Sequence, residues 1–220
     1  MQLILLGLPG AGKGTQAQVI AQQHRLLHIS TGDMFREAVA AGTELGKQAD
    51  SFMSRGDLVP DEVTIGMLLE RVARPDAEVG FMLDGFPRTI AQAEALDVAL
   101  QGQPIDAVLF IEVPESDLMA RLTGRWTCSE CGAIYHELNS PPRAAGQCDD
   151  CDSKLTQRDD DRPETVQARL DVNREWTEAL AVYYGDAGKL TRIDGTGESS
   201  AVTDRLLVAL ADVPVASGKA

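Results

Sequence analysis

The sequence is poor in positive charge. Its 220 residues include 20 Lys and Arg against 34 Asp and Glu, which gives a formal net charge of -14. Nucleic acids and anionic membranes are bound mainly through clusters of basic residues, so this charge argues against either as the main partner. If the ligand is a polyanion, the few cations must gather in one cleft. Most of them are arginines, whose planar group can bind two phosphate oxygens at once.

Long apolar runs are also missing. The first run, "LILL" at residues 3–6, is too short for a signal or membrane segment, and no later stretch is long enough to span a bilayer. These features predict a cytoplasmic protein. With 44% hydrophobic residues, the chain can bury a full core, as one domain or as one domain with insertions.

The stretch "GLPGAGKGT" at residues 7–15 follows directly on this apolar run. The pattern predicts a strand over 2–7, a glycine loop and a helix to residue 24, which is the context of a phosphate-binding loop. Its backbone N–H groups and the helix N-terminus attract phosphate, and Lys13 can bridge the terminal phosphates of a nucleotide. The usual Ser or Thr after the lysine is Gly14 here, with Thr15 one place later. The alternative is a glycine-rich turn with a surface lysine.

A second stretch, "GFMLDGFPRT" at residues 80–89, predicts a short strand that ends in Asp84. An acid at the end of a buried strand beside a phosphate loop is placed to hold Mg²⁺, directly or through water. Pro87 fixes a turn from which Arg88 can point into the cleft. Asp84 as a cap and Arg88 as a surface ion pair are the alternatives.

Strands and helices are predicted to alternate along most of the chain. Further strands are expected at 26–30, 106–113 and 189–194, and helices at 32–41, 44–55, 61–73, 115–122 and 199–210, with a long helix after Pro163. Ser30 or Thr31 caps the helix at 32–41, and Pro60 is expected in the first turn of the helix at 61–73. This alternation predicts an α/β fold with a central parallel sheet flanked by helices. Ligands of such sheets bind at the carboxyl ends of the strands, where Gly7, Asp84 and Asp194 fall.

Residues 125–161 break this alternation. They contain Cys128, Cys131, Cys148 and Cys151 in the pattern C-x₂-C-x₁₆-C-x₂-C, which is typical of a structural zinc site. Disulfides are disfavoured in a reducing cytoplasm, and a redox dithiol needs only one pair. Four sulfurs complete a tetrahedron, so we interpret His136, like His24 and His28, as a surface residue without a role.

The sequence resembles the adenylate kinase family over nearly its whole length. The resemblance rests on "GLPGAGKGTQ" (7–16), "ISTGDMFR" (29–36), "GDLVPDEV" (56–63), "LDGFPRTIAQAEAL" (83–96), "GRW" (124–126), "QRDDDRPETVQARL" (157–170) and "DGTG" (194–197). It implies reversible phosphoryl transfer from MgATP to AMP to give two ADP. It also implies a phosphate-loop core (1–29, 60–124 and 162–220), a helical AMP-binding insert (30–59) and a zinc-bearing, ATP-covering lid (125–161), with both inserts mobile. We expect a monomer.

The resemblance also assigns site residues. Those implied in catalysis are Lys13, Arg88, Arg125, Arg158 and Arg169. Those implied in ATP binding are Gly10, Ala11, Gly12, Lys13, Gly14, Thr15, Arg121, Arg125, Ile134, Tyr135 and Gly197. Those implied in AMP binding are Thr31, Arg36, Asp57, Leu58, Val59, Gly85, Phe86, Pro87, Arg88, Gln92, Arg158 and Arg169. Asp57 departs from a lysine common in the family, which changes little if that contact is made by the backbone. Asp159 to Asp161 are hinge acids or a solvated run, and we favour the hinge.

Three rival functions can be weighed on the sequence. A GTPase switch would need a guanine-reading N-K-x-D, which is missing from the sequence. A zinc-ribbon protein that binds nucleic acid would need a basic face, which the charge opposes. The nearest rival is a nucleoside monophosphate kinase that acts on UMP or CMP, or a relative that uses GTP as donor.

Overall fold

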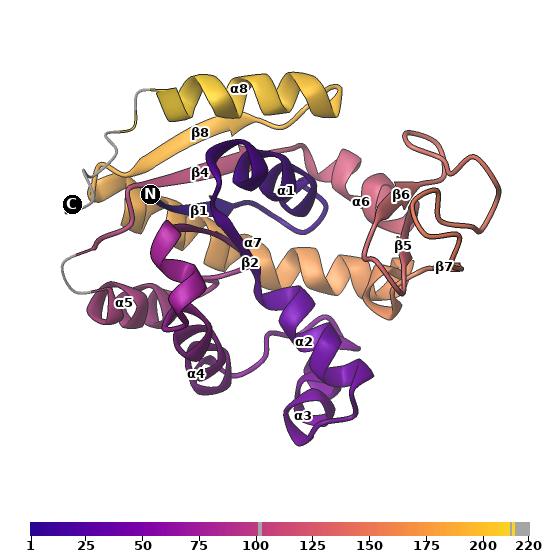
Figure 1. Cartoon of the computed structure of the whole chain (residues 1–220), viewed down its shortest axis with the longest axis horizontal. Coiled ribbons are helices and arrows are strands. Elements are labelled where there is room, and N and C mark those ends of the chain that lie inside the picture. Colours follow the sequence, from indigo (N-terminus) through magenta and orange to yellow (C-terminus); the bar gives the residue numbers. More distant parts are fainter. Residues whose placement is uncertain (101–102, 212, 214–220) are drawn as a thin grey trace.

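A central sheet of parallel strands organises the molecule (Figure 1). The computed structural model describes residues 1–100, 103–211 and 213. The strands lie in the order β2 (Leu27–Ser30), β3 (Phe81–Asp84), β1 (Gln2–Leu6), β4 (Ala107–Glu112) and β8 (Leu190–Asp194), and all neighbours are parallel. The predicted α/β fold with a central parallel sheet is confirmed. The carboxyl ends of all these strands therefore meet at one edge of the sheet, where ligands of such folds bind.

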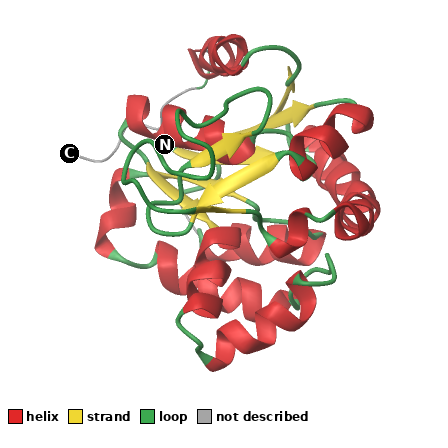
Figure 2. Cartoon of the chain, turned by 90° about the vertical axis from the view of Figure 1, so that its right-hand side faces the viewer, coloured by secondary structure: helices red, strands yellow, loops and turns green. Residues whose placement is uncertain are grey.

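Both faces of the sheet are buried, which is why its inner strands are apolar except at their ends. Along β1, Leu3 and Leu5 pack into one apolar cluster, and Ile4 and Leu6 into another. Helices α1 (Lys13–His24), α6 (Glu115–Thr123) and α8 (Ser199–Ala211) contribute to the first cluster. Helices α4 (Asp61–Val72), α5 (Ile90–Ala99) and the C-terminal half of α7 (Pro163–Asp186) contribute to the second. Figure 2 shows helices on both sides of the strands.

Two segments project from this core, and each has a small apolar cluster of its own (Figure 1). The helical insert (residues 30–59) carries α2 (Thr31–Ala40) and α3 (Glu44–Met53). The four-cysteine segment (residues 125–161) carries an antiparallel sheet of β5 (Arg125–Cys128), β6 (Ile134–His136) and β7 (Leu155–Thr156), followed by the 3₁₀ turn η2 (Asp159–Asp161). The domain boundaries stay a prediction, and residues 101–102, 212 and 214–220 of the predicted core lie outside the described part of the chain.

Of the two predicted caps of α2, the structure has Ser30, which accepts a hydrogen bond from the backbone N–H of Asp33 at 3.2 Å. The elements otherwise follow the predicted pattern with three differences. Pro60 lies outside the first turn of α4, because its ψ of 142° is extended and makes it the residue that precedes the helix. Helix α5 and the 3₁₀ helix η1 (Pro75–Val79) were not predicted. Within the described ranges, every helix is too short or too polar to cross a bilayer.

Candidate active site

The loop between β1 and α1 has the backbone of a phosphate-binding loop. Gly10 and Gly12 have φ angles of 84° and 92°, which residues with a side chain rarely adopt. A Cβ on Gly10 would also lie 3.0 Å from the Leu122 side chain. Gly12 precedes the first turn of α1 and Ala11 is buried beneath it, so the N–H groups of that turn are free to meet an anion.

Lys13 reaches back over this loop. Its ammonium group donates hydrogen bonds to the carbonyl oxygens of Gly7 at 2.7 Å and Leu8 at 3.1 Å. Burial lowers the pKa of Lys13 to about 8, against the opposing effect of Asp84, and the nearby charges of Arg88, Arg169 and Arg125 lower it further. A phosphate group beside Lys13 would restore the stability of its charged form.

Asp84 ends β3 immediately beside the loop. Its Oδ2 atom lies 3.4 Å from the position of a Cβ on Gly14, so a larger residue at position 14 would crowd the carboxylate. Burial raises the pKa of Asp84, but His28 and Lys13 outweigh this, and the pKa stays below its ordinary value. The interpretation of His28 as a surface residue was wrong, since its Nε2 atom is buried 3.8 Å from Asp84 Oδ2. Thr15 is exposed on α1.

Five predicted arginines gather at the same edge and form the arginine cluster: Arg36, Arg88, Arg125, Arg158 and Arg169. Burial lowers the pKa of Arg88 to about 10, and the charge of Arg169 adds to this effect. Burial also lowers the pKa of Arg158 to about 9, with further effects from Arg36 and Arg125. Cations that lower one another's pKa are close in space, so this cluster is suited to bind a polyanion.

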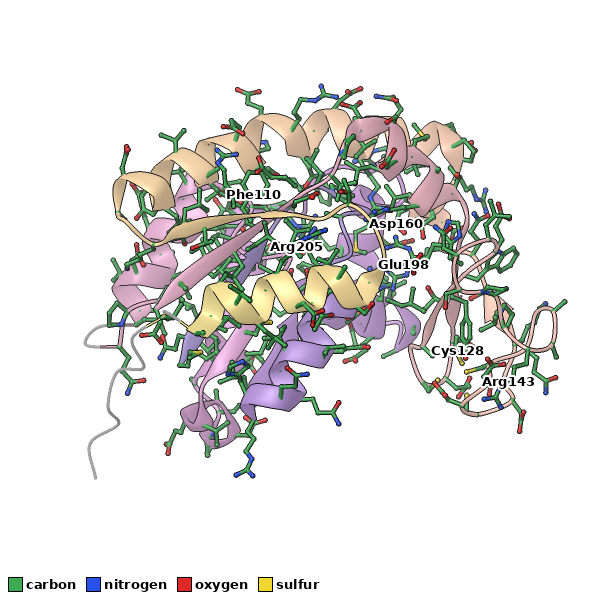
Figure 3. All side chains as sticks on the ribbon, turned by 90° about the horizontal axis from the view of Figure 1, so that it is seen from above. Phe110, Cys128, Arg143, Asp160, Glu198 and Arg205 are labelled. Carbon is green, nitrogen blue, oxygen red and sulfur yellow. The ribbon has the colours of Figure 1, made fainter. Side chains whose placement is uncertain are left out.

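Two acids that the sequence did not single out as site residues hold part of this cluster. Asp161 is fully buried, and its carboxylate accepts two hydrogen bonds from Arg125 and one of 3.0 Å from Arg169. Asp160 lies 3.2 Å from Arg169 and is labelled in Figure 3 at the base of the four-cysteine segment. Of the two readings left open for residues 159–161, a solvated run does not describe Asp161. Asp159 is exposed and pairs with Arg162.

A cavity lies between the helical insert and the core. Eight of the residues predicted to bind AMP line it: Thr31, Arg36, Asp57, Leu58, Val59, Arg88, Gln92 and Arg169. The sequence did not identify the other lining residues, which are Gly32, Phe35, Met53, Gly56, Thr64, Asp160 and Asn173. Phe35 falls within the "ISTGDMFR" stretch, whereas Met53 and Asn173 lie in no recognised motif. The side chain of Asp57 pairs with Arg55 at 3.1 Å.

The turn after β3 joins the cavity to the phosphate loop. Gly85 O accepts hydrogen bonds from Thr31 Oγ1 at 2.8 Å and from Arg88 Nε at 2.9 Å. Phe86 and Pro87 are buried beneath this turn and joined by a cis peptide bond. The turn therefore holds Arg88 between the two parts of the site.

The remaining predicted ATP contacts come from three elements. Arg121, in the last turn of α6, donates a 3.1 Å hydrogen bond to Gly195 O in the loop that also carries Gly197. Ile134 reaches from the four-cysteine segment toward the phosphate loop, where its Cδ1 lies 4.0 Å from a Cβ position on Gly14. Tyr135 instead points its hydroxyl toward the cysteines, 3.5 Å from Cys148 Sγ, and its backbone pairs with Trp126 of β5.

The four cysteines converge in one cluster. Their sulfur atoms all lie within 4.8 Å of one another. Cys128 Sγ is 3.4 Å from Cys151 Sγ, and Cys131 Sγ is 3.5 Å from Cys148 Sγ, distances far longer than the S–S bond of about 2.0 Å in a disulfide. Four sulfurs at about 2.3 Å from a tetrahedral Zn²⁺ would be separated by roughly 3.8 Å, so the cluster fits this ion. A hydrogen bond from Tyr135 lowers the pKa of Cys148, whereas contacts with the other sulfurs raise the pKa of Cys131, because thiolates this close repel one another without a cation between them.

His136 lies outside this cluster but has contacts of its own. Its Nε2 atom is 3.2 Å from Ala120 O at the end of α6, and its Nδ1 accepts hydrogen bonds from the N–H groups of Leu138 and Asn139. The half-buried imidazole therefore lies between the four-cysteine segment and α6, and the expectation that it has no role stays a prediction.

Comparison with known proteins decides the family. The adenylate kinase family model matches residues 5–189. The chain belongs to the adenylate kinase family. It is 56% identical to the adenylate kinase of Listeria monocytogenes serotype 4b (strain CLIP80459) over 197 residues, which are 89% of this chain and 92% of the relative. It is 52% identical to that of Desulforamulus reducens over 212 residues (96% and 100%), and 54% identical to that of Staphylococcus aureus (strain Mu50) over 205 residues (92% and 95%).

These likenesses cover both the core and the projecting segments. The chain is therefore an adenylate kinase, an enzyme that transfers a phosphoryl group reversibly between ATP and AMP. The resemblance seen in the sequence is confirmed, whereas the roles of single residues stay predictions.

Proposed function

We propose that the enzyme transfers the γ-phosphoryl group of MgATP directly to AMP, in line, and releases two ADP. The observation that most supports this mechanism is the arginine cluster beside Lys13, between the phosphate loop and the cavity. Burial and mutual repulsion make these cations unfavourable on their own. Two nucleotides whose phosphates meet at the cluster would supply the missing negative charge.

The roles of the cations follow from their positions. Lys13 holds the β- and γ-phosphates of ATP, and Arg36 and Arg88 hold the phosphate of AMP. Arg125, Arg158 and Arg169 close around the transferring group. The attacking atom is already a phosphate oxygen, so no general base is needed and catalysis consists of positioning and charge stabilisation.

Asp84 is the residue that would hold Mg²⁺, because its buried carboxylate lies beside Gly14 and Lys13. The ion arrives with ATP, and its charge offsets the negative charge of the phosphates during transfer. This contact would run through water, and Asp84 would thus help to position the phosphates beside Lys13.

Asp160 and Asp161 act as hinge acids. In the free enzyme Asp161 neutralises Arg125 and Arg169, which otherwise would be buried without a counter-charge. Incoming phosphates compete with this carboxylate for the same guanidinium groups. The exchange links nucleotide binding to movement of the four-cysteine segment, which acts as the lid that excludes water from the reaction.

Zn²⁺ is held by Cys128, Cys131, Cys148 and Cys151, whose spacing in the structure suits a closed tetrahedral site. Four sulfur ligands leave no position for a substrate or water, so the ion would stabilise the lid and take no part in the chemistry. Structural zinc contributes roughly 10–16 kcal/mol of apparent binding energy in small modules.

The test is a panel assay of the purified enzyme with AMP, UMP, CMP and GMP as acceptors and ATP or GTP as donor. The proposal expects ATP and AMP to be strongly preferred, with ADP as the sole product. Arg88→Met should lower turnover by about 10²–10⁵-fold, as expected for a charge that stabilises a transferring phosphate. Arg143→Met is the control, because Arg143 lies on the exposed outer side of the lid (Figure 3). Preference for UMP or CMP would favour the rival kinase.

The enzyme is further proposed to act as a monomer in the cytoplasm, with no nucleic acid or membrane partner. Its net charge of -14 supports this view, because a strongly negative molecule repels other copies of itself and anionic surfaces. Light scattering of the purified protein gives its molar mass in solution, which decides whether the enzyme is a monomer.

A further inference from the structure

Asp61 binds two polar side chains, of which Gln92 lines the cavity, although Asp61 belongs to no predicted site. It lies in the first turn of α4. Its Oδ1 accepts a 2.7 Å hydrogen bond from Gln92 Nε2, and its Oδ2 accepts one of the same length from Thr89 Oγ1. Thr89 in turn caps α5 by accepting from the N–H of Gln92 at 3.2 Å. A single carboxylate therefore ties the start of α4 to the start of α5.

The side chain of Gln92 is held at its other end as well. Its Oε1 atom accepts a 2.7 Å hydrogen bond from the backbone N–H of Arg88. Gln92 is 1% exposed and lines the cavity. An amide has two N–H donors and two acceptor lone pairs, and the protein uses one of each. One donor and one acceptor thus remain for a ligand.

The two partners permit only one orientation of this amide. A carboxylate can only accept hydrogen bonds, and a backbone N–H can only donate them. Turning the amide over would set Oε1 against Asp61 and Nε2 against the N–H of Arg88, and both contacts would become repulsive. Asp61 supplies the stronger constraint because its contact carries a full charge.

We infer that Asp61 is a positioning residue that sets base specificity at the acceptor site by fixing the orientation of the Gln92 amide. This inference rests on the proposed function, in which Gln92 pairs with the base of AMP. Adenine presents an acceptor at N1 and a donor at N6, which matches the free donor and acceptor of Gln92 in the fixed order. Hypoxanthine has the same shape but the reverse order, a donor at N1 and an acceptor at O6, and would pair only with a turned amide.

Asp61→Asn separates this role from a merely structural one. Asparagine has nearly the same shape and can hydrogen-bond to Thr89 and to Gln92, so the link between α4 and α5 is kept. It can pair with Gln92 in either orientation, however, because it both donates and accepts. The variant should therefore remain folded but lose the stronger of the two constraints on the amide, while the N–H of Arg88 still favours the original orientation.

The experiment measures kcat and KM with AMP and with inosine monophosphate as acceptors, at saturating MgATP. Asp61→Asn should lower the AMP-to-IMP ratio of kcat/KM by about tenfold or more, the effect of losing a hydrogen bond to a charged group. KM for ATP and kcat with saturating AMP should stay within about twofold of the wild type. The matched control is Glu62→Gln, the same charge change at the exposed neighbouring residue, which should leave the ratio unchanged.

The outcomes separate the inference from the function beneath it. A wild-type enzyme that uses AMP and IMP equally contradicts the pairing of Gln92 with adenine, and with it the proposed acceptor site. A wild type that discriminates, with an unchanged ratio in Asp61→Asn and a lowered ratio in Gln92→Leu, overturns the role of Asp61 alone. Equal losses with both acceptors, together with a raised KM for ATP, overturn it in favour of a structural role. If Asp61→Asn melts below the assay temperature, Asp61→Ala is judged by the same ratio.

Discussion

The ammonium group of Lys13 is held by two backbone carbonyls of the phosphate loop and faces three arginines. Replacing it with methionine keeps the length of the side chain and removes the charge. We expect Lys13→Met to lower turnover by about 10²–10⁵-fold, since a preorganised charge on the developing phosphate oxygens is lost. Steady-state assays with ATP and AMP measure this. Near-normal turnover in a folded variant would contradict the assignment of the loop.

The lowered pKa of Lys13 leads to a second prediction at this scale. With a pKa of about 8, Lys13 in the free enzyme has already lost part of its charge at pH 8.5. Bound phosphates favour the charged form of Lys13, so they raise its pKa, and the complex holds more protons than the free enzyme. Nucleotide binding at pH 8.5 should therefore take up a measurable fraction of a proton, whereas at pH 7 the uptake should nearly vanish.

Calorimetry in buffers of different ionisation enthalpy measures this proton uptake. The phosphates themselves contribute little above pH 8, because their last pKa is about 6. Lys13→Met should reduce the uptake, and Lys154→Met, at an exposed position on the lid, should leave it unchanged. Proton release on binding at pH 8.5 would show that the nucleotide does not stabilise the charged form of Lys13.

The four-cysteine segment is an element too small to be stable through apolar packing alone. Its cluster consists of Cys128, Tyr135, Cys148 and Leu155 with few neighbours, and half of these are proposed zinc ligands. The segment also has more acidic than basic side chains, and thiolates without a metal would add to that negative charge. We therefore predict one zinc per chain, needed for stability of the segment and not for the chemical step.

Removing the metal should lower the melting temperature by about 5 °C or more. Substantial activity should survive at low temperature, because Lys13 and Arg88 lie outside the segment. Metal analysis under reducing conditions, with melting and turnover of a Cys148→Ser, Cys151→Ser variant, checks both points. Absence of zinc together with an unchanged melting temperature would refute the prediction. Complete loss of turnover in a folded variant would assign the metal to the chemistry.

Elements whose signal lies within a short stretch could be predicted from the sequence. The phosphate loop and the cysteine pairs are such cases, because glycine conformation and ligand spacing are local. Helix α5 was missed because its buried face consists of Gln92, Ala93 and Leu96, which form no strong apolar stripe. Pro60 was placed one position too far into α4, since a proline fits on either side of a helix start.

Site residues that act through distant partners could not be predicted in this way. Asp161 is buried against an arginine 36 positions earlier in the chain, and Asp61 reaches Gln92 over 31 positions. His28 gave no sign of burial, because a lone histidine has the same pattern in a core as on a surface. In each case the tertiary fold supplies the partner, and no local pattern records it.

On the scale of the whole molecule, the apolar clusters divide the chain into parts of unequal stability. The two large clusters share the central sheet, whereas the helical insert packs mainly around Phe35, Ala49 and Val59. Each projecting segment also contacts the core at a few places. A Cβ on Gly56 of the insert would lie 2.7 Å from Arg169 Cγ, and Ile134 approaches Gly14. Segments with small clusters and few such contacts open at lower free energy than a shared core.

Amide hydrogen exchange should reveal this order. In the free enzyme, amides in residues 30–59 and 125–161 should exchange at least about tenfold faster than those of β1, β3 and β4, which corresponds to about 1.4 kcal/mol of opening free energy. Adding AMP with a non-hydrolysable ATP analogue should slow exchange in both segments, because phosphates at the arginine cluster are contacted from the insert, the lid and the core together. Lys13→Met with the same nucleotides is the control, and its lid should gain less protection. Uniform exchange over the whole chain, unchanged by nucleotides, would mean that the two segments do not open separately from the core. Closure of the segments over the substrates could then not be the means by which water is excluded.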